Sequence, residues 1–404
     1  MKRLSDLIKE ARGRLKGVVT PTPLVYSASL SRAYGLEVYL KAENLQKTGS
    51  FKARGAYNKI QSLQAGVRKK GVITASSGNH AQGVAWAASL SGVKATVVMP
   101  ETASIIKRVA TSGYGANVIL HGMFLDEAYS HALRLAKQNN LTFISPYDDD
   151  LVMAGQGTIG LEILDSLPEV DAVVIPVGGG GLISGIAAAI KDAKKRVRVI
   201  GVQAEASDSC MRSLKKGYPV DGKRTATIAD GIAVKRIGDK TFPVIKRCVD
   251  DCVAVSEDSI AGAVLKLMER KKLVVEGAGA TPLAALMEGK VRPARKGKTK
   301  VVLVLSGGNI DVTTLDRIIR LGLIREGRVK RLSIILPDVP GSLAGLTREV
   351  AALKANILHV IHLRDAESVA IGMTRLDLIL EVEGHEHSRR IARRLKEKGY
   401  DAKG

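Results

Sequence analysis

The sequence is poor in cysteine and in aromatic residues. Its 404 residues include only Cys210, Cys248 and Cys252, and aromatic side chains make up 3%. An odd number of cysteines without a paired CxxC motif predicts neither a disulfide framework nor a structural zinc site, and it favours a reducing cytoplasm. Few aromatic rings are available to stack on bases, which argues against single-stranded nucleic acid as a partner.

Long apolar runs are also missing. No uninterrupted apolar segment reaches the roughly 18 residues that a membrane-spanning helix needs. The first 16 residues are charged and amphipathic, without the apolar centre of a signal peptide. We therefore expect a soluble, cytoplasmic protein with no membrane partner, long enough to form two or three domains with substantial cores.

The charge is strongly one-sided, with a formal net charge of +22. Its densest basic run, residues 290–298, precedes the apolar segment Val301–Leu305, where a solvated loop is expected. We interpret the charge as a solvated surface that attracts anionic substrates, and we expect no nucleic-acid partner.

One lysine lies where an amine nucleophile would be useful. Thr48-Gly49-Ser50 is a turn and cap signal, and a helical run begins at Lys52. The positive end of a helix dipole and partial burial behind Phe51 both disfavour an ammonium ion, so Lys52 is predicted to titrate low and to present a free amine. A free amine attacks aldehydes. A single lysine is more often a surface charge, so this interpretation depends on the other motifs.

A run of four glycines is the second motif. The apolar strand expected at residues 171–177 leads into Gly178-Gly179-Gly180-Gly181, and an apolar helix is expected from Leu182 to Ile190. Successive backbone N–H groups in such a loop converge on an anion, and the following helix adds its dipole, so the run predicts a phosphate cradle. A flexible hairpin is the alternative. The run lacks the Walker and GxGxxG patterns, so a nucleotide is not favoured.

Two further loops follow expected strands. Residues 74–83 follow the short strand Val72-Ile73 with small hydroxyl residues at a helix start, which suits a carboxylate, and the amide of Asn79 suits a phenolic oxygen. Taken alone, Ser76 or Ser77 is more often a helix cap, and His80 is more often a structural histidine. Ser306 follows the strand Val301–Leu305. Ligands of open α/β sheets bind at the carboxyl ends of strands, so these motifs are expected to meet in one crevice.

In this order, the motifs resemble those of the fold type II pyridoxal-phosphate enzymes, and they are most similar to the threonine dehydratase (threonine ammonia-lyase) group. The resemblance covers about residues 1–325. It implies an α/β catalytic domain with two open twisted sheets, a smaller subdomain at about residues 55–155, and pyridoxal 5'-phosphate as cofactor.

The resemblance also implies roles for individual residues. Lys52 bonds covalently to the cofactor and is catalytic together with Ser306, which meets the pyridine nitrogen. Further residues are expected to contact the cofactor: Phe51, Asn79, Gly178, Gly179, Gly180, Gly181, Leu182, Gly231 and Glu276. The substrate carboxylate is expected to bind at Ser76, Ser77, Gly78, Asn79 and His80.

Residues 331–404 form a different unit after a polar, glycine-bearing linker at 323–330. Their pattern predicts the order β-α-β-β-α with a short last strand near residues 400–402, which is the ferredoxin-like βαββαβ plan. This segment resembles the ACT domain, a regulatory module that binds small molecules and usually pairs its sheets between chains. The resemblance implies a homo-oligomer, a dimer or tetramer, and isoleucine or valine as effector at Asp338, Gly341, Ser342 and Leu343, with Asn356 of a paired chain beside them.

No metal site is predicted. His359, His362, His385 and His387 fit no paired ligand spacing, so we expect them at exposed strand and helix positions. Gln203 stands where related enzymes that bind a divalent ion often carry an acidic residue.

The expected activity is conversion of L-threonine to 2-oxobutanoate and ammonia by β-elimination, and of L-serine to pyruvate. A serine or threonine racemase and a β-replacement synthase remain alternatives, because this fold fixes the cofactor and not the outcome. The third alternative is a catalytically silent amino acid sensor.

Overall fold

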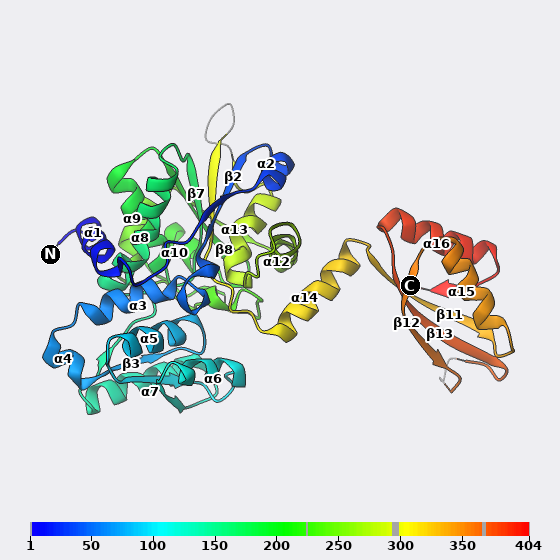
Figure 1. Cartoon of the computed structure of the whole chain (residues 1–404), viewed down its shortest axis with the longest axis horizontal. Helices are drawn as coiled ribbons and strands as arrows, with labels where there is room; N and C mark the ends of the chain where they lie inside the picture. Colours follow the sequence, from blue (N-terminus) through cyan, green and yellow to red (C-terminus); the bar gives the residue numbers. More distant parts are fainter. Residues whose placement is uncertain (1, 224, 293–298, 366–368, 404) are drawn as a thin grey trace. The chain divides into compact units, whose positions relative to one another are not determined.

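The computed structural model describes residues 2–223, 225–292, 299–365 and 369–403. The chain forms two compact units, Met1–Asp311 (unit 1) and Val312–Gly404 (unit 2), which are described separately (Figure 1). No helix within the described ranges is both long and apolar enough to cross a membrane. Residues 293–298 of the basic run lie outside those ranges.

Unit 1 contains a six-stranded sheet in the order β1-β2-β10-β7-β8-β9. Strand β1 is antiparallel to β2, and the other neighbours are parallel. The continuous apolar run Val301–Leu305 is fully buried, as expected for a central parallel strand covered on both faces. The strands are β1 Leu24–Tyr26, β2 Glu37–Ala42, β7 Ala172–Pro176, β8 Arg198–Ala204, β9 Asp251–Val255 and β10 Lys300–Leu305.

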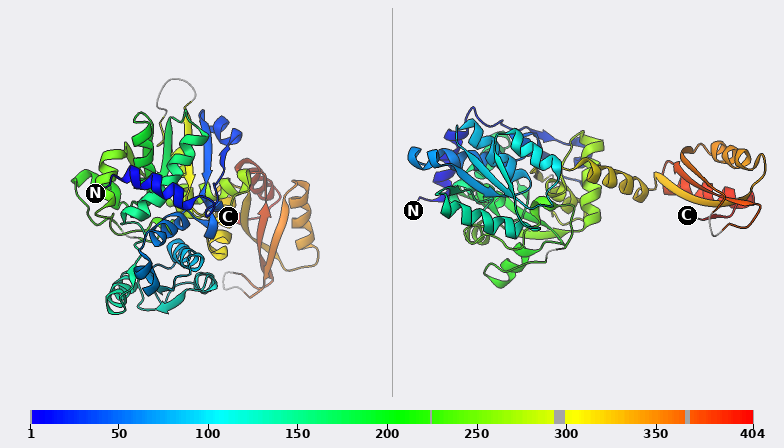
Figure 2. Two further views of the ribbon diagram at one scale, coloured as in Figure 1. Left: turned by 60° about the vertical axis from the view of Figure 1, so that its left-hand side comes forward. Right: turned by 90° about the horizontal axis from the view of Figure 1, so that it is seen from below.

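Helices cover both faces of this sheet, as Figure 2 shows. Val302 and Val304 pack with apolar residues of α1, α8, α9 and α11, while α13 contacts the four strands β7 to β10. Helices α8 and α9 approach closely: a Cβ on Gly185 would lie 2.2 Å from the Met153 carbonyl oxygen, so only glycine fits. The helices are α1 Leu4–Leu15, α2 Ala28–Tyr34, α8 Asp150–Ser166, α9 Gly181–Ala193, α10 Ser209–Lys216, α11 Thr241–Cys248, α12 Glu257–Lys271 and α13 Gly277–Met287.

A second, smaller sheet in unit 1 is fully parallel, in the order β5-β4-β3-β6. Helices α3 and α5 pack on one face, where Val97 and Met99 are buried, and α7 packs on the other face against Ile73 and Val98. Its elements are α3 Lys52–Gln61, α4 Ala65–Lys70, β3 Val72–Ala75, α5 Asn79–Leu90, β4 Ala95–Met99, α6 Ile105–Gly113, β5 Asn117–Leu120, α7 Leu125–Gln138 and β6 Thr142–Phe143. Unit 1 therefore has the two open α/β sheets expected from the sequence.

Unit 2 begins with α14 and continues in the order β-α-β-β-α-β, with an antiparallel sheet β12-β13-β11-β14. Leu332, Ile334 and Leu336 alternate toward a core that they share with Leu346 of α15 and Ile391 of α16. This architecture confirms the ferredoxin-like plan and fits an ACT-like domain. The elements are α14 Val312–Arg325, β11 Val329–Pro337, α15 Ser342–Ala352, β12 Asn356–Leu363, β13 Met373–Glu381, α16 His385–Glu397 and β14 Ala402–Lys403.

Two sequence-based expectations for this region were wrong. The polar tract 323–330 is mostly regular structure, because α14 extends to Arg325 and β11 begins at Val329. His387 is 4% exposed rather than on the surface. Its Nε2 lies 2.8 Å from the Leu353 carbonyl oxygen and its Nδ1 accepts from the Glu383 amide, so hydrogen bonds to the backbone hold it inside.

Candidate active site

A cavity of about 660 Å³ lies in unit 1 at the carboxyl ends of β3, β7 and β10. The loops after these strands all line it, as expected for parallel α/β sheets. Every residue that the sequence motifs assigned to a cofactor or a substrate contributes to its wall: Phe51, Lys52, Ser76, Ser77, Gly78, Asn79, His80, Gly178, Gly179, Gly180, Gly181, Leu182, Gly231, Glu276 and Ser306.

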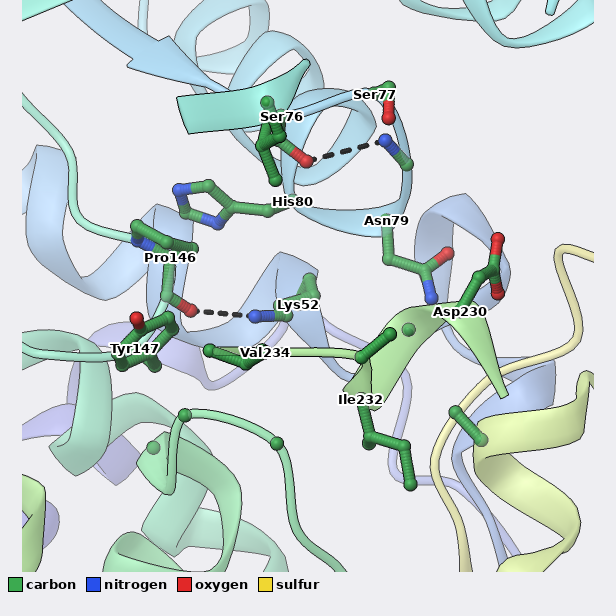
Figure 3. Close-up of a pocket in the computed structure, with 18 of the residues that line it drawn as sticks. Lys52, Ser76, Ser77, Asn79, His80, Pro146, Tyr147, Asp230, Ile232 and Val234 are labelled. Carbon is green, nitrogen blue, oxygen red and sulfur yellow. Dashed lines mark hydrogen bonds between the residues drawn. The ribbon is translucent and has the colours of Figure 1, made fainter. Parts of the chain in front are cut away.

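Lys52 is the first residue of α3. Its Nζ donates a hydrogen bond to the Pro146 carbonyl oxygen at 2.6 Å and lies 5.2 Å from the centre of the Phe51 ring (Figure 3). Burial lowers the pKa of Lys52 to about 8, although the Glu276 carboxylate acts in the opposite direction. The amine is therefore much easier to deprotonate than an ordinary lysine, and burial is the main cause.

A buried ion-pair network anchors the same helix. Arg54 is fully buried, and its Nε and Nη2 each donate to Glu43 at 2.8 Å, while its Nη1 donates to Glu162 at 2.5 Å. Lys41 also pairs with Glu162 at 2.5 Å. Because Arg54 is two residues from Lys52, this network fixes the start of α3.

The glycine loop joins β7 to α9. The Ser184 amide is bonded to the Gly180 carbonyl oxygen at 2.9 Å, so the amides of residues 181–183 have no acceptor within the helix. A Cβ on Gly179 would lie 2.4 Å from ring atoms of Tyr147, and Gly180 has φ of +95°. Glycine is required at both positions, and the amides without an acceptor in the helix suit a phosphate group.

A second helix start faces the cavity. Gly78 precedes α5, and the first backbone bond of that helix joins the Gln82 amide to the Gly78 carbonyl oxygen at 3.3 Å. The amides of residues 79–81 are therefore free to bind an anion such as a carboxylate. Ser76 accepts a bond from the Gly78 amide at 3.3 Å, which orders the loop (Figure 3).

Asn79 links the two sheets. Its Nδ2 donates to both carboxylate oxygens of Glu276, at 2.8 and 3.0 Å, and its Oδ1 accepts from Asn309 at 2.6 Å. Burial and the nearby Asp230 carboxylate together raise the pKa of Glu276 to about 7, against the effect of the Asn79 bonds and of the Lys107 and Lys52 charges. The Glu276 carboxyl group therefore takes up and releases a proton near neutral pH.

Ser306 lies at the end of β10 and is 2% exposed. Its carbonyl oxygen accepts from the Phe51 amide at 3.1 Å, and the Gly308 amide donates to the Gly49 carbonyl oxygen at 2.9 Å. A β-bridge between Ser50 and Gly307 completes this contact. Ser306 and Lys52 are therefore held by one short stretch of paired backbone.

The sequence motifs missed several residues of the cavity. Lys107 of α6 forms ion pairs with Asp230 at 3.1 Å and Asp311 at 3.6 Å, and it joins the smaller-sheet region to the larger. Pro146 and Tyr147 belong to an irregular segment before α8. Asp230 was visible in the sequence, because it directly precedes Gly231, but a lone acidic residue carries no signal of its own.

The residues expected to bind an effector lie in unit 2. Gly341 has φ of +91° and precedes α15, and Asp338 accepts from Arg364 at 2.9 Å. Asn356, at the start of β12, donates to Glu381 at 3.2 Å. Asp338 and Gly341 lie in the loop before α15, and Ser342 and Leu343 form the first turn of that helix. Within one chain Asn356 is not beside them, because it lies opposite Glu381, at the other end of β13 from the Asp338 loop.

Comparisons with known proteins agree with this geometry. The family described as pyridoxal-phosphate dependent enzymes matches residues 15–307. An L-threonine ammonia-lyase of Thermotoga maritima is 51% identical over 398 residues, 98% of each chain. The processed form of threonine deaminase isoform 2 from Solanum lycopersicum superposes with a TM-score of 0.74 at 37% identity, over 79% of this chain and 93% of that one. Maize serine racemase gives a TM-score of 0.74 at 35% identity, over 79% and 98%.

Proposed function

The chain belongs to the family of pyridoxal-phosphate dependent enzymes, and we propose that it is an L-threonine ammonia-lyase that also accepts L-serine. The family and the cofactor expected from the sequence are confirmed by the match over residues 15–307. The relative named as an L-threonine ammonia-lyase aligns over 98% of this chain, so both units are shared with it.

The residues of the cavity fit the cofactor. Lys52 offers an amine that burial makes easy to deprotonate, with a pKa of about 8. The loop Gly178–Gly181 offers a cradle for the phosphate, and a Cβ on Gly179 would clash with the Tyr147 ring. When bound, pyridoxal phosphate supplies an aldehyde for the substrate amino group and a ring that withdraws electrons from the substrate Cα.

Lys52 supplies the base. Its Nζ, once free, accepts the proton from the substrate Cα, and its pKa of about 8 leaves much more of the amine uncharged near neutral pH than in an ordinary lysine. The Pro146 carbonyl oxygen, 2.6 Å from Nζ, orients the amine during this step. Burial strengthens the hydrogen bond that orients the amine, because water that would compete for it is excluded.

The start of α5 receives the substrate carboxylate. The free amides of residues 79–81 and the hydroxyls of Ser76 and Ser77 are donors, and the helix dipole favours an anion there. Binding at this fixed point sets the position of the substrate Cα relative to Lys52.

Ser306 and Asn79 set the electronic character of the site. Ser306 offers a neutral hydroxyl at the position assigned to the pyridine nitrogen, and unlike a carboxylate it does not hold a proton on that nitrogen. The site therefore disfavours a long-lived carbanion, which favours β-elimination over transamination. Asn79, held by Glu276 and Asn309, provides an amide for the phenolic oxygen.

The low-pKa Lys52 at the meeting point of the glycine loop and the α5 start carries this proposal. The test is product analysis: purified enzyme with pyridoxal phosphate is expected to form 2-oxobutanoate and ammonia from L-threonine. Lys52→Ala should abolish turnover and the yellow absorbance, while Lys69→Ala on the exposed helix α4 should change neither. D-serine formed from L-serine, or cysteine formed with an added thiol, as the main product would instead support the racemase or synthase. A folded protein that binds effector without turnover would support the sensor.

We further propose that unit 2 is an ACT regulatory domain. Its βαββαβ order and the glycine turn before α15 support this assignment. A branched-chain amino acid, isoleucine or valine, would place its carboxylate at the first turn of α15, where the Leu343 amide has no acceptor within the helix. Asp338 lies beside this turn, and Asn356 would come from a paired chain. If the effector lowers threonine affinity, threonine must lower effector affinity by the same factor.

Titration with isoleucine and valine tests this regulatory proposal. Full-length enzyme should change its rate of 2-oxobutanoate formation, and Asn356→Ala should need at least 10-fold more effector. Glu397→Gln, at the end of α16, is the matched control and should respond as the parent does. Identical effector responses in all three proteins would reject the assigned site.

We also propose a cytoplasmic homo-oligomer, a dimer or tetramer. Edge strand β12 exposes Leu358, Val360 and Ile361, by 44%, 43% and 49%, which suits pairing with the same edge of a second chain. The free Cys210, Cys248 and Cys252 are compatible with a reducing compartment. Light scattering of Val360→Lys against the parent would test the pairing, and an unchanged mass would contradict it.

A further inference from the structure

His80 has one ring nitrogen with no partner. The side chain is 3% exposed, and its Nε2 lies 3.0 Å from the Ile144 carbonyl oxygen. A carbonyl oxygen only accepts, so Nε2 carries the ring hydrogen and Nδ1 carries a lone pair. Among the residues that the structure describes, no donor reaches Nδ1. A buried acceptor without a donor is costly, and it indicates that a ligand supplies the missing hydrogen.

The ring is held neutral. Burial, together with the nearby Lys52 charge, lowers the pKa of His80 to about 3. The imidazole therefore stays an acceptor at Nδ1 throughout the physiological range, and it cannot become a cation that attracts an anion. For this reason the His80 side chain does not suit a carboxylate, and any contribution of His80 to carboxylate binding would come from its backbone amide.

The position of the His80 ring limits which group of a bound substrate can donate to Nδ1. His80 lines the cavity, and Figure 3 shows its ring between Ser76 and the Lys52–Pro146 pair. Lys52 already donates to the Pro146 carbonyl oxygen. In the proposed function, the substrate carboxylate binds at the start of α5 and the substrate Cα lies at Lys52, so a substituent on Cβ remains to face His80. The donor that L-threonine and L-serine carry there is the β-hydroxyl.

We propose that Nδ1 of His80 accepts a hydrogen bond from the substrate β-hydroxyl and so selects β-hydroxy amino acids. This inference rests on the proposed function and adds a specificity-determining residue to it. A site that is built to bind a hydroxyl discriminates strongly against analogues without one, because its buried acceptor is then left unpaired. The hydroxyl hydrogen would point to His80, which leaves the oxygen lone pairs for the acid that assists departure.

Two substitutions separate the two ring nitrogens. His80→Asn keeps an acceptor close to the position of Nδ1 but loses the bond to Ile144, whereas His80→Gln reaches toward Ile144 but places no acceptor at the position of Nδ1. Each holoenzyme is assayed with L-threonine and with β-chloro-L-alanine, whose β-substituent has no hydrogen to donate. His121→Phe is the control, since that ring stacks on His131 at 3.9 Å and does not line the cavity.

We expect His80→Gln to lose about 10- to 100-fold in kcat/KM on L-threonine and little on β-chloro-L-alanine, as loss of one buried hydrogen bond predicts. His80→Asn should retain most of the threonine activity. As a readout besides turnover, L-2-aminobutanoate, which lacks the hydroxyl, should inhibit the parent and His80→Gln with similar constants.

Equal losses on both substrates in His80→Gln would overturn the inference, because they would show a structural role or a contact with Lys52. So would a larger threonine defect in His80→Asn than in His80→Gln. If the parent eliminates chloride from β-chloro-L-alanine but forms no 2-oxobutanoate from L-threonine, the proposed function itself fails, and this outcome is distinct from failure of the His80 contact alone.

Discussion

Replacement of Glu43 by glutamine should strongly destabilise the enzyme. Glu43 is fully buried and accepts two hydrogen bonds at 2.8 Å from Arg54, which is itself fully buried. The Glu43→Gln variant leaves the guanidinium with one carboxylate, Glu162, whose side chain is 24% exposed. Removing one partner of a buried ion pair costs about 3 to 5 kcal/mol, because the remaining charge stays buried without full compensation.

The matched control is Asp165→Asn. Asp165 pairs with Arg12 at 2.7 Å, but the two side chains are 54% and 57% exposed, so loss of that pair should cost about 0 to 1 kcal/mol. Chemical denaturation of the parent and both variants, followed by circular dichroism at neutral pH, measures the two differences. Equal unfolding midpoints for Glu43→Gln and Asp165→Asn would refute the reasoning.

The pH dependence gives a second check on Glu43. Burial alone raises the pKa of this carboxyl, but Arg54 and its hydrogen bonds outweigh burial and leave the pKa below 4.5. A depressed pKa stabilises the folded state above the unfolded-state value and loses that contribution as the pH falls through the folded-state value. The gap between parent and Glu43→Gln should therefore be full at neutral pH and narrow below about pH 4.5. A gap that widens in acid would contradict the assignment.

Three other outcomes follow from the site. In cofactor-free enzyme, reductive alkylation of Lys52, followed by mass spectrometry, should rise with an apparent pKa of about 8, and a midpoint near 10.5 would show that the amine is not buried as described. Ser306→Asp should slow elimination and increase the ratio of racemisation or half-transamination to elimination. An unchanged product ratio would contradict the role given to the neutral hydroxyl of Ser306. Gly179→Ala should raise the dissociation constant for pyridoxal phosphate at least 10-fold in an absorbance titration, because its Cβ would lie 2.4 Å from the Tyr147 ring. Gly66→Ala on α4, where a Cβ meets nothing within 4 Å, should leave that constant unchanged, and equal affinities in both variants would contradict the packing argument.

The parts of the site that the sequence predicted are local. Lys52, the four glycines and the start of α5 each combine a strand or turn signal with a helix start, and such signals lie within about ten residues of sequence. The strand residues 301–305 were equally clear, since a continuous apolar run is typical of a buried parallel strand. Bounds of these elements shifted by only a few residues.

The parts that the sequence did not predict depend on tertiary contacts. Tyr147 and Pro146 lie in a segment without periodicity, and only the fold brings Tyr147 against Gly179. Lys107 resembles any other surface lysine until Asp230 and Asp311 are placed beside it. His387 was expected at an exposed position because the spacing of the four histidines fits no metal-ligand pattern, but backbone groups of residues 353 and 383 compensate its burial.

The backbone contact between residues 49–51 and 306–308 has a consequence for synthesis of the enzyme. Phe51 and Gly49 are paired with Ser306 and Gly308, and the Asn309 side chain donates to the Thr48 carbonyl oxygen at 2.7 Å. Residues 49–51, next to Lys52, are therefore held in place by residues that are synthesised roughly 250 positions later in the chain. Contacts that are so distant in sequence form late in folding. A nascent chain that has not yet completed β10 therefore carries Lys52 without the burial that lowers its pKa, and it gains the ability to hold its cofactor only when unit 1 is almost fully synthesised.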